Sequence, residues 1–283
     1  MSHPSSVQTL LAQAQHQLET AGSDEPQANA QWLLASVLGV SRTWILSHSD
    51  YELSAPEERQ YAHWLKRKAA GEPLAYIVGE QPFDGLSIRV TPDVLIPRPE
   101  TEELVELVSS LYERKEKYSF LDMCTGSGCI ACALAKRFVQ AHILAVDKSP
   151  KALAVAAQNV KNLHLAERVH LLQSDVWEEV QGQFDLIIAN PPYIPSQIMD
   201  TLTREVLSEP RMALEGGVDG LDVVRALCSA AGDYLNKDGW MALELCKGQA
   251  QAVARGLEEI GWRCEVKKDI VGIERFVLAQ RIN

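Results

Sequence analysis

The stretch that decides the fold is residues 118–147, YSFLDMCTGSGCIACALAKRFVQAHILAVD. A short apolar run leads into a glycine turn at Gly126 and Gly128, a helix-like segment follows, and a second apolar run ends at Asp147. A strand, a tight turn, a helix and a second strand in this order are typical of a βαβ unit, whose two strands are parallel. The sequence therefore predicts an α/β domain built on a mostly parallel sheet.

The same alternation continues to the end of the chain. Further strands are predicted over 168–175, 184–190, 239–246, 264–270 and 274–280, and further helices over 149–163, 221–235 and 249–261. Because the last two strands follow one another directly, they can pair as a hairpin and make the sheet mixed at its edge. An amphipathic helix is also predicted over 99–115, ahead of the first strand.

The first part of the chain has a different pattern. Apolar residues at helical spacing predict three helices and a small all-α domain over residues 1–72. Residues 73–98 are rich in Gly and Pro and contain the alternating stretch LSIRV, which indicates a linker with a β-hairpin. Residues 99–283 then form the α/β domain. The helical domain shows no catalytic motif, so it is either a scaffold or a docking module for a macromolecular substrate.

Composition narrows the class of protein. The chain has 283 residues, is 46% hydrophobic and carries a net charge of −11. That charge argues against binding along a phosphate backbone, which needs a positive surface. No apolar run reaches the 18 residues of a membrane span, and no signal peptide is recognisable at the N-terminus. We therefore expect a cytoplasmic protein with no membrane attachment and no direct nucleic-acid binding.

The six cysteines include a CxxC pair, Cys129 and Cys132. Metal and redox sites use this spacing, but the pair lies in a segment, CIACALA, that is predicted to be a helix packed in the core. No second CxxC and no HxxxH is present to complete a zinc site. The two thiols are therefore interpreted as small apolar packing groups, and no metal is expected.

The glycine turn and Asp147 together suggest a cofactor site. Glycines between a strand and a helix let a ligand approach the backbone, although the dinucleotide fingerprint GxGxxG has Ala131 in its third glycine position. Asp147 ends the second strand about twenty residues on, where a carboxylate can accept hydrogen bonds from ribose hydroxyls. Its alternative role is to cap the next helix, which Ser149 can do instead. These features fit any nucleoside-containing cofactor.

The strand over 184–190 ends in Asn190, Pro191, Pro192 and Tyr193. The prolines make the turn rigid and deprive it of backbone donors. The Asn190 side-chain oxygen and the Pro191 carbonyl can each accept one hydrogen of a planar amide or amino group, while Tyr193 packs on its face. Alone, such a turn is often only a rigid loop with a capping asparagine. After a glycine turn and a ribose-binding acid, it favours a methyltransferase acting on nitrogen.

The order of DMCTGSG, AVD, QSD and NPPY resembles the class I S-adenosylmethionine-dependent methyltransferases. EPLAYIVG, DVLIPRPETEELV, SEPRMALEGGVDGLD and KDIVGIERFVLAQ narrow the resemblance, over nearly the whole chain, to the HemK/PrmC type of protein-(glutamine-N5) methyltransferase. The resemblance implies a Rossmann-like sheet of seven strands, S-adenosylmethionine without a metal, and methylation of the glutamine in the Gly-Gly-Gln motif of class 1 peptide release factors.

The resemblance also implies roles for individual residues. The cofactor would contact Cys124, Thr125, Gly126, Ser127, Gly128, Asp147, Asp175, Val176 and Asn190. Asn190, Pro191, Pro192 and Tyr193 would hold the glutamine and form the catalytic turn. Since the family often has glycine where Cys124 stands, the backbone there is expected not to need a glycine-only conformation. Some members carry tryptophan directly after the acid at Asp175. Here Val176 takes that place, and a one-residue shift turns the ring of Trp177 to another face.

Three other readings stay open on sequence alone. CTGSG also occurs in a sister group that methylates a large-subunit ribosomal protein on glutamine. NPPY suits adenine N6 in a nucleic acid equally well, although the charge of −11 counts against it. The fold could also be kept by a non-catalytic binding module. Arg98, Glu100 and Glu102 either cover the site or form a charged first helical turn, and Glu244 is expected to be a buried structural carboxylate.

Overall fold

The computed structural model describes residues 6–282, and these form two compact units. The first, the helical unit, contains residues 6–79 together with Thr203–Ser208. The second, the sheet unit, contains residues 80–202 and 209–282. Each unit has its own apolar core.

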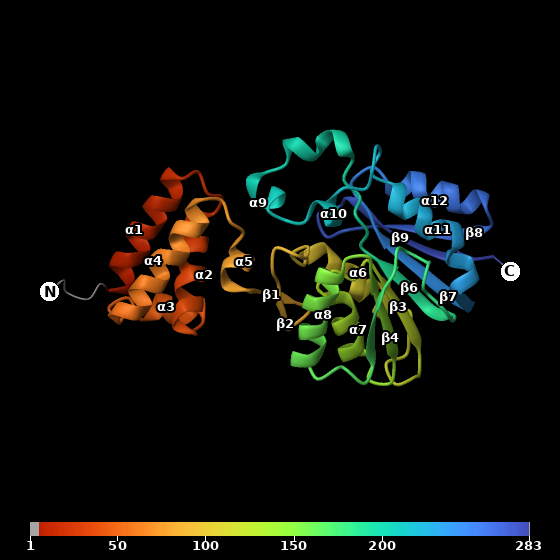
Figure 1. The fold of residues 1–283 in the computed structure, drawn as a ribbon, viewed down its shortest axis with the longest axis horizontal. Helices are drawn as coiled ribbons and strands as arrows, with labels where there is room; N and C mark the ends of the chain where they lie inside the picture. The colour runs from red at the N-terminus through yellow and green to blue at the C-terminus, as the bar shows by residue number, and fades with distance from the viewer. Residues whose placement is uncertain (1–5, 283) are drawn as a thin grey trace. The chain divides into compact units, whose positions relative to one another are not determined.

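The helical unit consists of short amphipathic helices packed around one core (Figure 1). The helices around this core are α1 (Val7–Thr20), α2 (Pro26–Leu38), α3 (Arg42–Ser47), α4 (Ala55–Ala69) and α5 (Leu74–Val78). The short helix α9 (Arg204–Leu207) belongs to the same unit but buries no residue. Serines begin three of them: the side chains of Ser6 and Ser41 accept backbone N–H groups of the first turn, and Ser54 forms a capping box with Glu57. The apolar spacing that predicted the three longer helices therefore marks their buried faces.

The sheet unit is built on seven strands in the order β5-β4-β3-β6-β7-β9-β8. The strands are β3 (Ser119–Met123), β4 (His142–Asp147), β5 (Val169–Gln173), β6 (Phe184–Ala189), β7 (Leu235–Glu244), β8 (Trp262–Lys268) and β9 (Glu274–Arg281). The pairs among β5, β4, β3, β6 and β7 are parallel, and β9 runs antiparallel to both β7 and β8. This confirms the predicted mostly parallel sheet of seven strands with a hairpin at its edge.

Helices cover both faces of this sheet. They are α6 (Pro99–Ser109), α7 (Cys129–Arg137), α8 (Pro150–Asn162), α11 (Asp222–Tyr234) and α12 (Ala250–Glu259). Leu121 and Met123 of β3 share a core with α11 and α12, whereas Phe120 packs against Phe138 at the end of α7, with ring centroids 5.3 Å apart. Because successive side chains of a strand point to opposite faces, α7 and the α11–α12 pair lie on opposite sides.

The predicted hairpin is present as β1 (Glu80–Phe83) and β2 (Leu86–Arg89). The two-residue turn between them has φ of 49° at Asp84 and 73° at Gly85, and positive φ at both positions is the geometry that favours Asp-Gly in tight hairpins. Asn159 of α8 donates to the Arg89 carbonyl and accepts from the Arg89 N–H, which fixes the hairpin to the sheet unit.

Between β6 and α11 the chain forms three short helical turns that the sequence pattern did not predict. They are the 3₁₀ helix η1 (Ser196–Thr201), α9 and α10 (Arg211–Leu214). They are too short for an apolar period to be recognisable. In α9, Glu205 forms an ion pair with Lys68 of α4, within the helical unit.

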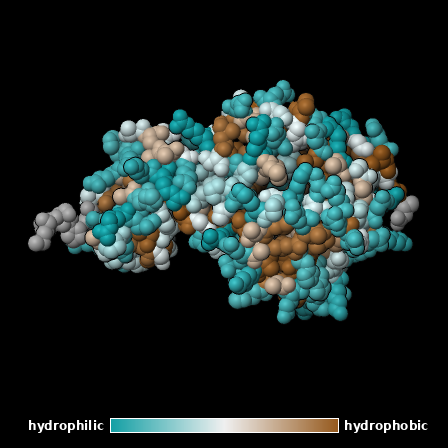
Figure 2. All heavy atoms as spheres, viewed as in Figure 1, coloured by the Kyte–Doolittle hydropathy of each residue, from teal (hydrophilic) through white to brown (hydrophobic). Residues whose placement is uncertain are grey.

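The surface seen in Figure 2 is mostly hydrophilic; its broadest group of apolar residues lies on the sheet unit, and smaller groups are scattered over both units. None of the helices among residues 6–282 is both long enough and apolar enough to cross a membrane.

Candidate active site

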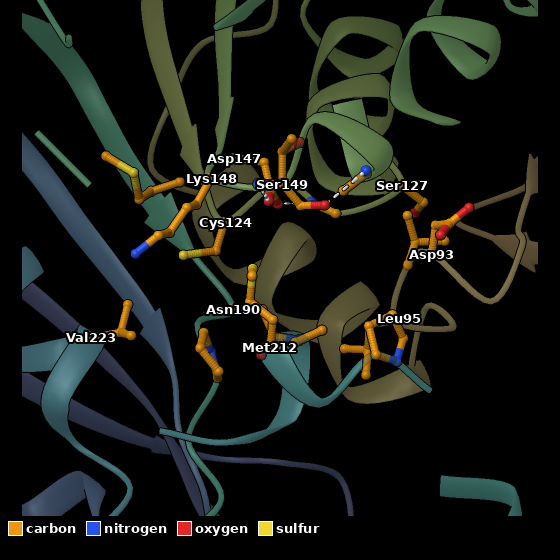
Figure 3. A pocket seen from close by; sticks show the side chains of 18 of the residues that line it. Asp93, Leu95, Cys124, Ser127, Asp147, Lys148, Ser149, Asn190, Met212 and Val223 are labelled. Carbon is orange, nitrogen blue, oxygen red and sulfur yellow. Dashed lines mark hydrogen bonds between the residues drawn. The ribbon is translucent and has the colours of Figure 1, made fainter. Parts of the chain in front are cut away.

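A cavity of about 500 Å³ lies at the carboxyl ends of the parallel strands, where α/β proteins bind ligands. In Figure 3, Cys124 and Asp147 approach it from the strand ends, with Asn190 and Met212 facing them and Asp93 and Leu95 to one side. Of the predicted site residues, Cys124, Thr125, Gly126, Ser127, Asp147, Asp175, Val176, Asn190 and Pro192 line the cavity. Gly128, Pro191 and Tyr193 are not part of its wall.

Cys124 begins the glycine turn in a left-handed conformation, with φ of +62°. This conformation favours glycine but is not restricted to it, in line with the expectation that the position needs no glycine-only backbone. The Thr125 N–H still donates to the Val146 carbonyl of β4, at 2.9 Å, so the chain has to turn sharply while it remains bonded to the neighbouring strand. A residue in the left-handed conformation makes that turn, and this conformation costs about 1–2 kcal/mol in a residue that has a Cβ.

The two glycines of the turn serve different purposes. Gly126 has φ of +55°, and a Cβ added there would meet no atom within 4 Å, so its backbone is open to a ligand. Gly128 has φ of +78°, and an added Cβ would lie 3.2 Å from the Ala156 Cβ. Gly128 therefore allows α7 to pack closely on α8, which explains why it does not line the cavity.

Asp147 accepts two backbone hydrogen bonds and still faces the cavity. Its Oδ2 accepts from Gly126 N and its Oδ1 from Ser149 N, each at 2.8 Å. Burial raises the pKa of this carboxyl, while these bonds oppose the shift. Ser149 caps α8, accepting from Ala152 N at 3.2 Å, so the alternative capping role belongs to Ser149. Each Asp147 oxygen keeps a lone pair for a hydroxyl donor.

The segment after β5 forms another wall of the cavity. Asp175 pairs with Lys148, and Val176 has φ of +50°, a strained value for a β-branched residue. Trp177 turns away and stacks on Tyr234 of α11, with ring centroids 4.4 Å apart, and its Nε1 donates to backbone carbonyls of α11. The one-residue shift thus places Val176 at the cavity, while Trp177, partly buried, packs against the core of the sheet unit.

Asn190 lines the cavity and carries an unused acceptor. Its Nδ2 donates to Thr101 Oγ1 at 3.0 Å, and the Thr101 hydroxyl in turn donates to Glu244 Oε2 at 2.7 Å. Asn190 Oδ1 is buried and has no hydrogen-bond partner among residues 6–282. Because an unpaired buried polar atom costs about 1–3 kcal/mol, this oxygen indicates a site for a ligand that donates a hydrogen bond.

A glycine-rich loop supports the backbone of the turn that follows Asn190. Ile194 N donates to the Leu214 carbonyl at 2.8 Å, and the Gly216 N–H returns a bond of 2.9 Å to the Ile194 carbonyl. Gln249 Nε2 donates to the Tyr193 carbonyl at 3.0 Å. The Tyr193 hydroxyl lies 3.4 Å from Glu244 Oε1, below the cavity wall. The turn is therefore held along its length by residues far away in the sequence.

Two further wall segments were not predicted as site residues. One is 92–98, of which Pro92–Leu95 and Pro97–Arg98 line the cavity, and the other is 210–215, in which Met212 is 58% exposed. Arg98 forms an ion pair with the buried Glu209, which also accepts from Ile96 N at 2.9 Å and so ties the two segments together. The sequence signals for these segments were IPRP and SEPR. Of the three residues expected either to cover the site or to form a charged first helical turn, Arg98 lines the cavity, whereas Glu100 and Glu102 lie in the first turn of α6 and do not.

Glu244 is 1% exposed and ends β7, as expected for a buried carboxylate. Burial raises its pKa from 4.5 to about 7, against hydrogen bonds from Thr101 and Tyr193 and the charge of Arg275, while the charge of Glu100 adds to the increase. Glu244 is connected to the site through Thr101, which donates to Glu244 and accepts from Asn190. The sequence did not reveal this connection.

The cavity fits a nucleoside-containing cofactor. It offers an open backbone at Gly126, a carboxylate at Asp147 with lone pairs for ribose hydroxyls, and a volume within the usual range for small-molecule sites. Cys129 and Cys132 are buried, as packing groups are, and within residues 6–282 no cluster of three or more His, Cys, Asp or Glu side chains could hold a metal ion.

Comparison with known proteins decides the family. The sequence matches the PrmC N-terminal domain over residues 9–79 and the methyltransferase small domain over residues 104–219. A release factor glutamine methyltransferase from Moorella thermoacetica is 40% identical over 97% of this chain and 98% of its own length. One from Geobacter sulfurreducens is 40% identical over 96% and 95%, respectively. The chain belongs to the release factor glutamine methyltransferase family.

Solved structures agree with this family at the level of the fold. A methyltransferase from Pyrococcus furiosus superposes with a TM-score of 0.53, covering 78% of this chain and 97% of its own, at 21% identity. Membership confirms the resemblance drawn from IPRPETE and NPPY, and the chain is a methyltransferase of the S-adenosylmethionine-dependent class. The sister group and the nucleic-acid reading are not favoured, because the near-full-length relatives carry the release-factor name.

Proposed function

We propose that this enzyme transfers a methyl group from S-adenosylmethionine to the side-chain amide nitrogen of the glutamine in the Gly-Gly-Gln motif of class 1 peptide chain release factors. The observation that carries the proposal is Asn190 Oδ1, a buried acceptor without a partner in the described residues, which lies in the wall of a nucleoside-sized cavity. A primary amide supplies the donor that this oxygen lacks.

Residues at the strand ends hold the cofactor. Asp147 accepts from the ribose hydroxyls, the open backbone from Cys124 to Ser127 approaches the amino-acid part, and Asp175 and Val176 border the adenine. When bound, S-adenosylmethionine supplies an electrophilic methyl group on its sulfonium. Asp147 is already aligned by the Gly126 and Ser149 N–H groups, so little reorganisation is needed on binding.

The turn from Asn190 to Tyr193 holds the glutamine. Asn190 Oδ1 and the Pro191 carbonyl each accept one amide hydrogen, which orients the nitrogen and raises its electron density, and Pro192 forms the adjoining wall. Tyr193 packs on the amide plane once its ring turns toward the substrate. The rate gain comes mainly from orientation and exclusion of water, and no strong base is needed, because the nitrogen becomes acidic after transfer.

The helical unit is proposed to dock the release factor, since a folded protein substrate needs recognition beyond one glutamine side chain. Because the proposed substrate acts in translation termination, the enzyme is proposed to act in the cytoplasm. No membrane or nucleic-acid contact is part of this proposal, and the net charge of −11 agrees with a protein partner.

Methyl transfer from labelled S-adenosylmethionine tests the proposal with three substrates in parallel. These are a purified class 1 release factor, the same factor with its Gly-Gly-Gln glutamine changed to alanine, and duplex DNA. Label is expected on the first alone, and Asn190→Ala should lower its rate about a hundredfold, the loss typical of removing one well-placed hydrogen-bonding group. Label on DNA, or equal label on both proteins, would overturn the proposal.

A further inference from the structure

The orientation of the Asn190 amide is not fixed by its own position. An asparagine side chain can rotate so that either Oδ1 or Nδ2 faces the cavity, and the two arrangements have almost the same shape. Only one of them accepts a hydrogen bond from a substrate amide. Some neighbouring group therefore has to select the orientation, and it has to do so before the substrate arrives.

Strand pairing brings Glu244 next to Asn190. β6 and β7 are parallel neighbours, with Ala189 opposite Leu243, so the residues that follow each of these lie side by side at the end of the sheet. Thr101, in the first turn of α6, lies between the two side chains. Thr101 is 2% exposed, so water does not compete for these bonds.

The chain of donors and acceptors has one direction. The carboxylate of Glu244 can only accept, so the single proton of the Thr101 hydroxyl is donated to it, at 2.7 Å. Toward Asn190, Thr101 Oγ1 is then only an acceptor, and it takes a hydrogen from Nδ2 at 3.0 Å. In the reversed orientation Asn190 Oδ1 would face an oxygen without a proton, and Nδ2 would occupy the substrate side.

We propose that Glu244 and Thr101 are positioning residues, which hold the Asn190 amide with its oxygen facing the cavity and so prepare it to accept the substrate amide. This inference rests on the proposed function and names two residues that lie outside the turn from Asn190 to Tyr193. Thr101 borders the cavity, whereas Glu244 does not line it. Their effect on the reaction passes entirely through Asn190.

Matched substitutions of Thr101 test the direction of the chain. Thr101→Val keeps the shape but removes the hydroxyl, and kcat should fall about tenfold or more, since a misdirected amide repels the substrate N–H. Thr101→Ser restores the hydroxyl and should recover most of kcat. The dissociation constant for S-adenosylmethionine should change less than twofold in both. Equal kcat values for the Val and Ser variants would overturn the proposal.

A double-mutant cycle separates positioning from general support of the fold. In an Asn190→Ala background there is no amide to orient, so Thr101→Val should cause no further loss in single-turnover methyl transfer. A further loss equal to that in the wild type would overturn the proposal, because Thr101 would then act independently of Asn190. If Asn190→Ala alone leaves the rate unchanged, the failure lies in the proposed function of the turn.

Discussion

Gly220 gives the sharpest test of how the turn at Asn190 to Tyr193 is supported. A Cβ at Gly220 would lie 2.2 Å from the Tyr193 carbonyl oxygen and 2.7 Å from Gln249 Nε2. Ordinary contacts of a Cβ begin near 3.4 Å, so Gly220→Ala has to displace the turn by about 1 Å, a misplacement that can cost about a hundredfold in rate. Gly220 also has φ of +80°, which an alanine adopts only with strain.

Gly248→Ala is the matched control. Gly248 has φ of +90°, yet a Cβ there would meet no atom within 4 Å. Gly248→Ala should therefore destabilise the protein only by the strain of a left-handed backbone, about 1–2 kcal/mol. Gly220→Ala should add about 1–3 kcal/mol for the close contacts of the new Cβ. For a unit of this size the added cost lowers Tm by about 2–4 °C per kcal/mol.

Thermal unfolding and methyl transfer to a release factor measure the two effects in both variants. Gly220→Ala should lose more stability than Gly248→Ala, and it alone should lose about a hundredfold in kcat. If both variants lose the same stability and keep the same kcat, close packing against the Tyr193 carbonyl does not position the turn.

Three further predictions concern single side chains. Burial raises the pKa of Glu244 to about 7, so its carboxyl is protonated as the pH falls through that value and can then donate a hydrogen bond to Thr101. The direction of the hydrogen bonds from Asn190 through Thr101 to Glu244 is then lost, and kcat of the wild type should fall. In the same pH–rate measurement, kcat of Thr101→Val should stay low and independent of pH. The groups facing that carboxyl are Thr101, Tyr193, Arg275 and Glu100. Cys124→Gly should be about 1–2 kcal/mol more stable than Cys124→Ala in urea unfolding. Both variants lose the sulfur, but only glycine adopts the positive φ without strain. Equal stabilities would contradict a strained turn at this residue. Asp147→Asn should weaken S-adenosylmethionine binding, measured by calorimetry, about tenfold or more. The substitution replaces one carboxylate oxygen by an NH₂ group that faces a backbone N–H, and a charge-assisted hydrogen bond to the ribose is lost. Unchanged affinity would contradict a role of Asp147 in binding the ribose.

Much of the fold follows from local sequence patterns. The run from Tyr118 to Asp147 carries its strand, turn, helix and strand in a single continuous segment, and apolar periodicity is a local property. NPPY could likewise be related to the site, because a rigid turn that ends a buried strand has to lie at the carboxyl edge of the sheet. Asp147 could be interpreted as a ligand-binding residue because Ser149, two residues later, was available to cap the following helix, as it does in α8.

What the sequence did not reveal depends on contacts between distant residues. Thr101, Asn190 and Glu244 meet only because α6, β6 and β7 converge, and no spacing along the chain records that meeting. The left-handed φ of Cys124 accompanies a bond from the next residue, Thr125, to β4, which no local pattern along the chain records. The short turns between residues 196 and 214 have too few residues to show a period.

The central claim is that the nitrogen held by Asn190 belongs to a release-factor glutamine. Tandem mass spectrometry of a class 1 release factor, methylated by this enzyme with labelled S-adenosylmethionine, tests it most directly. One added methyl group is expected, located on the side-chain amide of the Gly-Gly-Gln glutamine and formed about a hundredfold more slowly by Asn190→Ala. A methyl group on any other residue, or the same modification formed at the wild-type rate by the Asn190→Ala enzyme, would contradict it.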